Sequence, residues 1–367
     1  MASCLNNIAV LMRAQGRLAE AETLYGQALE IKRKKLGAEH SEVGGMLNNL
    51  GAVLYAQGQL GPATAHFQQA LAISTKAHGG EEHANVAETM NNLGMLLKEQ
   101  GDLDGALNMY TRALEIKRKV HGLEHSKVAV GLNNLASLHQ TAGRLGEAEP
   151  LIKESLDIAK KVHGDEHPQV AAGLNNLAAL LRARCACAKG EPCACGKLNE
   201  AEPLYAEATA IFRTVCGEEH PNVAISLNNQ VQLLQQQQRY AEAEPLIKAA
   251  LAIQKKAFGD EHPAVAESLN SLAGLLEAQG RLDEAASWRR ECIAIGTKVL
   301  GEENPRVAGW MHHFACGLKK RGKEGGDAAA QDEAQRVGAR ALAIFEHVLG
   351  PDHPNTRAVR SWWGAKG

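Results

Sequence analysis

Paired asparagines recur along the chain and provide the first candidate chemistry. A side-chain amide carries donors and an acceptor, so a row of amides can hold an extended peptide backbone or bond one helix to the next. Asparagine is unfavourable inside a helix, so its repetition there needs a binding or structural reason. The pairs are Asn6-Asn7, Asn48-Asn49, Asn91-Asn92, Asn133-Asn134, Asn175-Asn176 and Asn228-Asn229.

Four cysteines within eleven residues form the second candidate site. Cys185, Cys187, Cys193 and Cys195 make two Cys-x-Cys pairs in a Gly/Pro-containing segment. Four thiolates could coordinate zinc or Cu(I), although the spacing is not the usual Cys-x2-Cys of zinc sites. The alternative is a Cys/Ala insertion that a turn tolerates. The other four cysteines are predicted to be small core residues.

A Gly-x-Glu-His motif recurs once per repeat, ending for example at His40, His83 and His167. Histidine beside glutamate can serve a metal site or acid–base catalysis. Its regular recurrence at an interhelical turn instead indicates a shared structural role, such as capping the next helix. His312-His313, at a degenerate asparagine position, is read as repeat decay.

Composition and absent motifs exclude several classes of function. The 40 basic and 42 acidic residues nearly cancel, and the basic runs 32–35 and 117–119 lack interleaved aromatics, so no nucleic-acid partner is expected. The chain has no apolar run long enough for a membrane span and no signal peptide. It has no phosphate loop, His-Glu-x-x-His or Gly-x-Ser-x-Gly. We therefore expect a cytoplasmic protein that is not an enzyme and needs no cofactor.

These candidate residues are carried by a repeat that covers the whole chain. The first asparagines of successive pairs, continued by Asn270 and His312, are separated by 42, 43, 42, 42, 53, 42 and 42 residues. The step of 43 comes from an extra glycine at Gly79-Gly80, and the step of 53 from the cysteine-rich insertion. About eight copies, the first and last incomplete, form one array over residues 1–367.

Each copy is predicted to be a hairpin of two helices. In the copy that begins at Pro168, Leu174, Leu177 and Leu181 recur at helical spacing on one face. In most copies a glycine such as Gly143 ends the first helix. Aromatic content is only 4%, and small residues lie at the expected helix contacts, which favours closely packed helices. Alanine or glycine occupies the first-helix positions 51, 94, 136, 178 and 273.

The repeat resembles the tetratricopeptide signature. The form Leu-Asn-Asn-Leu-Ala, then Gly-Arg-Leu-x-Glu-Ala-Glu-Pro-Leu, then Gly-x-Glu-His-Pro-x-Val-Ala is similar to the 42-residue subtype of kinesin light chains and nephrocystin-3-like proteins. This resemblance implies an all-α, right-handed superhelical solenoid. The chain begins inside a first helix and has no heptad segment, so the motor-subunit role of kinesin light chains does not carry over.

The resemblance also implies where a ligand would bind. First helices line the concave face in this family, and asparagines there often hold a peptide. Of the eight residues six positions after the second asparagine, expected nearby, four are basic and one is acidic, which would favour a ligand with acidic residues. The alternatives are asparagines that only bond neighbouring helices and basic residues that form a solvated helix flank. The predicted peptide-binding residues are Asn49, Asn92, Asn134, Asn176, Asn229, Tyr55, Lys98 and Arg182.

The function predicted from the resemblance is a protein-interaction scaffold that captures a peptide segment of a partner. A cargo adaptor or a ciliary or cytoskeletal assembly factor is the more specific version. The second hypothesis is a metal- or redox-responsive module built on Cys185, Cys187, Cys193 and Cys195. The third is a regulatory repeat subunit of a separate enzyme.

Three segments depart from the regular array. The insertion spans 185–196 inside the fifth repeat, and a helix over 354–363 is predicted to cap the C-terminal end. Trp362-Trp363 would cover the apolar end of the array, or would form a contact for a partner or a second copy. The first copy lacks the first turn of its helix, which indicates a truncated reading frame, a partner or self-association through the terminal repeats.

Overall fold

The computed structural model describes residues 1–185 and 196–363. This part of the chain forms 17 helices and no strand, as the sequence predicts. Odd-numbered helices are the first helix of each hairpin (helix A), and even-numbered helices are the second (helix B). The helices are α1 (Ala2–Ala14), α2 (Leu18–Leu36), α3 (Ser41–Ala56), α4 (Leu60–Ala77), α5 (Ala84–Glu99), α6 (Leu103–His121), α7 (Ser126–Thr141), α8 (Leu145–His163), α9 (Pro168–Ala183), α10 (Lys197–Cys216), α11 (Pro221–Gln236), α12 (Tyr240–Phe258), α13 (Pro263–Ala278), α14 (Leu282–Leu300), α15 (Pro305–Gly325), α16 (Ala328–Val348) and α17 (Pro354–Trp363).

From α3 onward, each helix A begins after a side chain that caps it. His40 accepts the backbone N–H of Glu42 at Nδ1, at 3.2 Å, and Asn304 accepts that of Arg306 at 2.9 Å. The first N–H groups of a helix have no partner within it, so each cap satisfies one of them. The capping role predicted for the Glu-His motif is confirmed. The same contact is made by His83, His125, His167, His220, His262 and His353.

Small residues on helix A let it approach helix B of the same hairpin. A Cβ added at Gly51 would lie 2.9 Å from the ring of Phe67, which is fully buried. At the equivalent position of the next hairpin, a Cβ on Gly94 would lie 3.0 Å from the ring of Tyr110. The aromatic residue of helix B therefore fills the space that the missing side chain leaves, as the pattern of small residues predicts.

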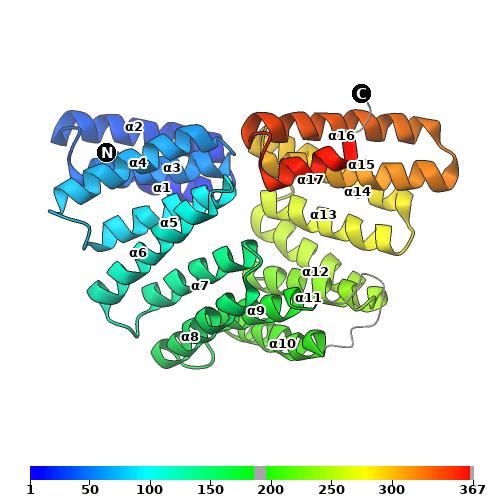
Figure 1. Cartoon of the computed structure of the whole chain (residues 1–367), viewed down its shortest axis with the longest axis horizontal. Coiled ribbons are helices and arrows are strands. Elements are labelled where there is room, and N and C mark those ends of the chain that lie inside the picture. Colours follow the sequence, from blue (N-terminus) through cyan, green and yellow to red (C-terminus); the bar gives the residue numbers. More distant parts are fainter. Residues whose placement is uncertain (186–195, 364–367) are drawn as a thin grey trace.

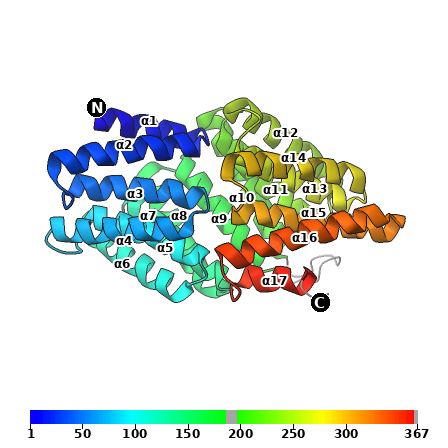
Figure 2. The ribbon, with the colours of Figure 1, turned by 90° about the horizontal axis from the view of Figure 1, so that it is seen from above.

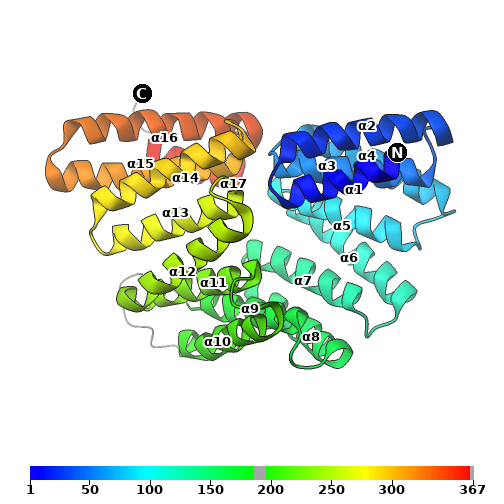
Figure 3. The same ribbon diagram turned by 180° about the vertical axis from the view of Figure 1, so that it is seen from behind.

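The hairpins stack into a right-handed superhelix. Helix A lies on the inside of the curve and helix B on the outside, as Figure 1 and the reverse view in Figure 3 show. Consecutive A helices touch one another, for example α3 with α5 and α9 with α11. Exposed side chains in the middle of helix A therefore face the concave side, and the paired asparagines lie there.

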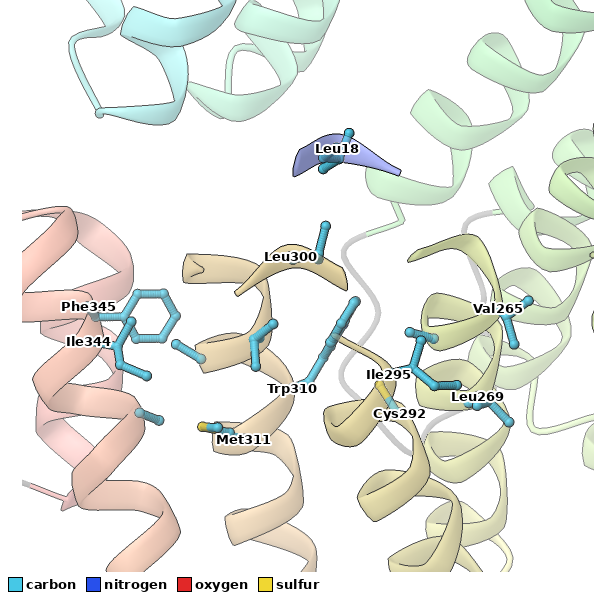
Figure 4. Close-up of a cluster of buried hydrophobic side chains, with 14 of the residues drawn as sticks. Leu18, Val265, Leu269, Cys292, Ile295, Leu300, Trp310, Met311, Ile344 and Phe345 are labelled. Atoms are coloured by element: carbon cyan, nitrogen blue, oxygen red, sulfur yellow. The ribbon is translucent and has the colours of Figure 1, made fainter. Parts of the chain in front are cut away.

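The chain curves far enough for its first hairpins to meet its last ones (Figures 1 and 2). One buried apolar cluster contains residues from both ends, including Leu18 at the start of α2 and Leu300 at the end of α14. Figure 4 shows these two side chains near one another, above Trp310. The superhelix thus touches itself along a contact that we call the seam.

The C-terminal helix α17 starts like a helix A, after the cap residue His353. It packs against α16, and Trp363 is buried against Gly338, where an added Cβ would lie 2.3 Å from the indole. The Trp363 indole N–H donates to Nδ1 of His312 at 2.8 Å, whereas Trp362 is 54% exposed. No helix among the described residues has the length and apolar character to cross a bilayer.

Candidate functional site

The paired asparagines lie in a row across neighbouring A helices, which we call the ladder. Each rung is one possible amide–amide hydrogen bond between two A helices; a rung is closed when the bond is formed and open when it is not. The first two rungs are closed. Asn49 on α3 donates its amide N–H to the side-chain oxygen of Asn6 on α1, at 3.0 Å. Asn92 on α5 donates in the same way to Asn48 on α3, also at 3.0 Å. These two predicted ligand residues therefore bond neighbouring helices with their N–H groups, which is the structural alternative considered for them.

The next two rungs are open. By the same spacing, Asn134 on α7 would donate to Asn91 on α5, and Asn176 on α9 to Asn133 on α7. Neither bond is made, and the amides of Asn134 and Asn176 have no partner within the described residues. The side-chain oxygens of Asn91 and Asn133 are buried and unpaired there. The open rungs therefore leave the amides of Asn134 and Asn176 without a partner on the concave side.

Beyond the open rungs, the ladder changes character. Asn175 accepts from Ser226 at 3.1 Å, and Asn228 donates to Ser268 at 2.8 Å. The half-buried Asn229 on α11 has no side-chain partner within the described part of the chain. Asn134, Asn176 and Asn229 are thus the predicted asparagines whose amides are available to a ligand.

Exposed apolar residues lie one helical turn before these available asparagines. Val130 on α7 is 47% exposed and Ile225 on α11 is 52% exposed, and the exposed Ala172 occupies the same position on α9. Positions four apart share a helix face, so these side chains lie beside Asn134, Asn229 and Asn176. The α7–α9–α11 surface therefore combines free amides with apolar contact area.

The three predicted residues outside the asparagine ladder lie in different surroundings. Lys98, at the end of α5, donates to the hydroxyl of Ser137 on α7 at 3.0 Å, and burial lowers the pKa of its ammonium group. Arg182 lies beside the hydroxyl of Tyr205 within its own hairpin. Tyr55 lies at the seam, where burial and the neighbouring Glu99 raise the pKa of its hydroxyl to about 12.

Of the predicted metal ligands, only Cys185 falls within the described residues. It is 8% exposed and lies two residues after the end of α9. Cys187, Cys193 and Cys195 lie outside the described part of the chain. Within residues 1–185 and 196–363, no three His, Cys, Asp or Glu side chains converge as a metal-ligand set.

The basic run at 117–119 is engaged within the protein. Lys117 is 3% exposed, and burial is the main cause that lowers its pKa to about 8. Arg118 pairs with Glu154 at 2.7 Å, and Lys119 pairs with Glu82. Arg118 thus joins α6 to α8 of the next hairpin, and Lys119 joins α6 to the turn before α5.

Sequence reasoning missed the residues that form the seam. His262, Asn304 and His353, the caps of α13, α15 and α17, contact the ends of α1, α3 and α5. No local pattern distinguishes these caps from the others. Only the superhelical pitch determines which caps reach the other end of the chain. The pitch arises from small rotations summed over several hairpins.

Comparisons with known proteins agree with this architecture. A family model described as Tetratricopeptide repeat matches residues 1–76, 42–119, 127–189 and 228–298, and a second with the same description matches 193–222 and 327–355. No curated protein matches the chain.

Several solved structures are similar. A Rap protein complexed with competence and sporulation factor is 15% identical with a TM-score of 0.58, and the match covers 99% of this chain and 98% of that one. The Rap conjugation gene regulator of plasmid pLS20, in complex with the Phr* peptide, is 16% identical with a TM-score of 0.56, covering 79% and 72%. Putative kinesin light chain repeats from Podosopora anserina are 26% identical with a TM-score of 0.44, covering 59% and 98%.

Proposed function

The chain belongs to the tetratricopeptide repeat family, and from this premise we propose that it is a non-enzymatic adaptor that holds a peptide segment of a partner protein on its concave face. The site proposed is the surface of α5, α7, α9 and α11. The observation that carries the proposal is the pair of open rungs, Asn134 with Asn91 and Asn176 with Asn133.

An extended peptide has the groups that this surface lacks. Its carbonyl groups can accept from the amide N–H groups of Asn134 and Asn176, and its backbone N–H groups can donate to the side-chain oxygens of the same two residues. Each net hydrogen bond of this kind is worth about 1 kcal/mol. Alternate side chains of the peptide would lie against Val130 and Ile225, so the expected ligand carries aliphatic residues.

Unpaired positive charge supports an acidic residue in the ligand. Lys98 and Arg182 form no salt bridge within the described part of the chain, and Lys98 is half-buried with a lowered pKa. A carboxylate placed beside either group would stabilise its charged form. This electrostatic contribution would act on specificity and on the association rate more than on affinity.

The more specific proposal, a cargo adaptor or a cytoskeletal or ciliary assembly factor in the cytoplasm, rests on the resemblance of the repeats to kinesin light chains. Two of the similar structures are complexes, one with the Phr* peptide and one with competence and sporulation factor, and the first agrees with a peptide ligand. The metal-responsive alternative has only the buried Cys185 among the described residues, and no further observation supports it.

The test is selection from a display library of random peptides, with the full-length protein as bait. The proposal predicts binders that share aliphatic residues and an acidic residue, and that lose binding to the Asn134→Ala/Asn176→Ala variant. Substitution of Lys98 by Gln should weaken the acidic binders mainly at low salt. Binders that ignore both changes would show that the working surface lies elsewhere.

A further inference from the structure

Three equivalent bridges hold the two ends of the superhelix together at the seam. Nε2 of His353 donates to the backbone oxygen of Glu99 at 3.1 Å, and Nδ2 of Asn304 donates to that of Ala56 at 3.5 Å. His262 makes the corresponding contact with the backbone of Ala14. The three acceptors are the last residues of α5, α3 and α1.

Each bridging side chain has two tasks. One atom caps the start of its own helix A, and the second donates to the end of a helix A one superhelical turn away. The last carbonyl groups of a helix have no partner within it, so the donor satisfies a group that would otherwise need water. Successive hairpins of one end therefore dock on successive hairpins of the other in a fixed register.

The turns that meet the bridges differ from the other turns of the array. Gly58 has a φ of +79°, and a Cβ there would lie 2.9 Å from both Asn304 and Pro305. Gly143 and Gly280 have φ values of +73° and +79° and nothing within 4 Å of such a Cβ. In another hairpin, Gln238 adopts a φ of +61° with a full side chain. A side chain at Gly58 is therefore disfavoured by the residues across the seam as well as by the backbone conformation.

The rest of the seam is loosely filled. Apolar contact comes from the neighbourhood of Leu18 and Leu300 (Figure 4). Between the turns remain a cavity of about 750 Å³, reaching from Leu60 to His347, and one of about 280 Å³ beside Tyr55. Both are clefts that reach the surface, so the ends meet at the bridges and at the apolar contact around Leu18 and Leu300, which separation would expose.

The seam shares a helix with the proposed ligand surface. α5 contributes Asn91 to an open rung, and its last residue, Glu99, accepts the bridge from His353. The Glu99 carboxylate also lies beside Tyr55 and Arg306, which come from opposite sides of the seam. A change in the position of α5 therefore changes both places.

We propose that the seam is a latch that closes the superhelix into a ring, with a closed state held by the three bridges and an open state in which the two ends separate. A ligand shifts such an equilibrium only by its differential affinity for the two states. Since α5 belongs to both the seam and the ligand surface, the two states differ in the position of α5 and bind a ligand differently, so the latch regulates the concave surface. Only this coupling rests on the proposed function, because the latch itself can be tested without a ligand.

The test uses the full-length protein without ligand and the substitution Asn304→Asp. Aspartate keeps the oxygen that caps Arg306, but it replaces the donor to Ala56 with a second acceptor. The latch predicts a larger radius of gyration in solution scattering. It also predicts at least about tenfold faster hydrogen exchange at the turns 14–18, 56–60 and 99–103, the change that ~1.4 kcal/mol of lost closure would give.

Two further variants separate opening from general destabilisation. Gly58→Ala and Gly143→Ala share the same backbone strain, but only the first places a Cβ against the seam. The latch predicts that Gly58→Ala opens the ring and that Gly143→Ala does not. Asn304→His should keep both contacts and stay closed. If Asn304→Asp and Gly58→Ala both give the scattering profile and exchange rates of Gly143→Ala, the latch is overturned, whatever the outcome for peptide binding.

Discussion

At the residue scale, two cap histidines with a lowered pKa, His167 and His262, tie the stability of the fold to pH. Each accepts an N–H group at Nδ1, so it must be neutral to cap its helix. Both stack on an aromatic ring at the end of the preceding helix B, His167 on His163 at 4.1 Å and His262 on Phe258 at 4.2 Å. Burial, followed by the neighbouring His163, lowers the pKa of His167, and burial also lowers that of His262.

We predict that the protein loses stability as the pH falls below the unfolded histidine pKa of about 6.5. When the pKa is lower in the folded state, the unfolded state binds more protons as the pH falls. The free energy of unfolding therefore keeps its full value above that pH and decreases below it. Further lowered pKa values at His78, His121, His139, His312 and His313, the last at about 4, act in the same direction. Urea unfolding at pH 7.5 and 5.5 measures the change.

The matched control is His167→Asn, which keeps a cap oxygen, as Asn304 does naturally, but cannot titrate. It should reduce the pH dependence of unfolding, whereas His167→Ala should cost about 1 kcal/mol at neutral pH through the lost cap. Equal pH dependence in the wild type and in His167→Asn would show that cap protonation contributes nothing.

At the element scale, most of the hairpin could be predicted from the sequence. Caps, apolar spacing and small residues are local signals, and Gly51 against Phe67 follows directly from them. The state of the asparagine ladder could not be predicted in this way. Asn92 and Asn134 occupy the same position in identical dipeptides, yet only Asn92 reaches its neighbour. That difference depends on the exact displacement between adjacent A helices.

Two glycine substitutions test the packing of helix A on helix B. Gly51→Ala should destabilise the protein by about 1–3 kcal/mol, because the new Cβ overlaps the Phe67 ring. Gly26→Ala on α2 has nothing within 4 Å of the new Cβ, so it should stabilise by about 0.5–1 kcal/mol through helix propensity. Denaturant unfolding measures both variants, and a stabilised Gly51→Ala would refute the close approach.

The cysteine-rich insertion provides a test between the adaptor and the metal module. We predict that replacing residues 184–196, between α9 and α10, with a three-residue turn like that between α7 and α8 leaves stability and peptide binding unchanged. Stacked hairpins interact mainly with their nearest neighbours, so a shortened turn disturbs the array little. A zinc-dependent rise in melting temperature in the wild type, absent from the shortened protein, would favour the metal module instead.

At the scale of the whole molecule, the superhelix touches itself along the seam. Its closure brings Tyr55 to the seam, although Tyr55 was predicted to bind peptide together with Lys98 and Arg182. Sequence reasoning could not foresee this placement, because Tyr55 meets Arg306 only after the rotation of several hairpins has accumulated. The concave surface that remains for a ligand is centred on α7, α9 and α11, opposite the seam.

The central claim is that the open rungs hold the ligand and the closed rungs hold the fold. It is tested most directly by calorimetric titration of a display-selected peptide into three forms of the full-length protein. Asn134→Ala/Asn176→Ala should weaken binding by about thirtyfold, for two lost hydrogen bonds of ~1 kcal/mol each, with little change in stability. Asn49→Ala/Asn92→Ala should lower stability and leave affinity nearly unchanged. Wild-type affinity in the first variant, or the reverse pattern between the two, would contradict the account.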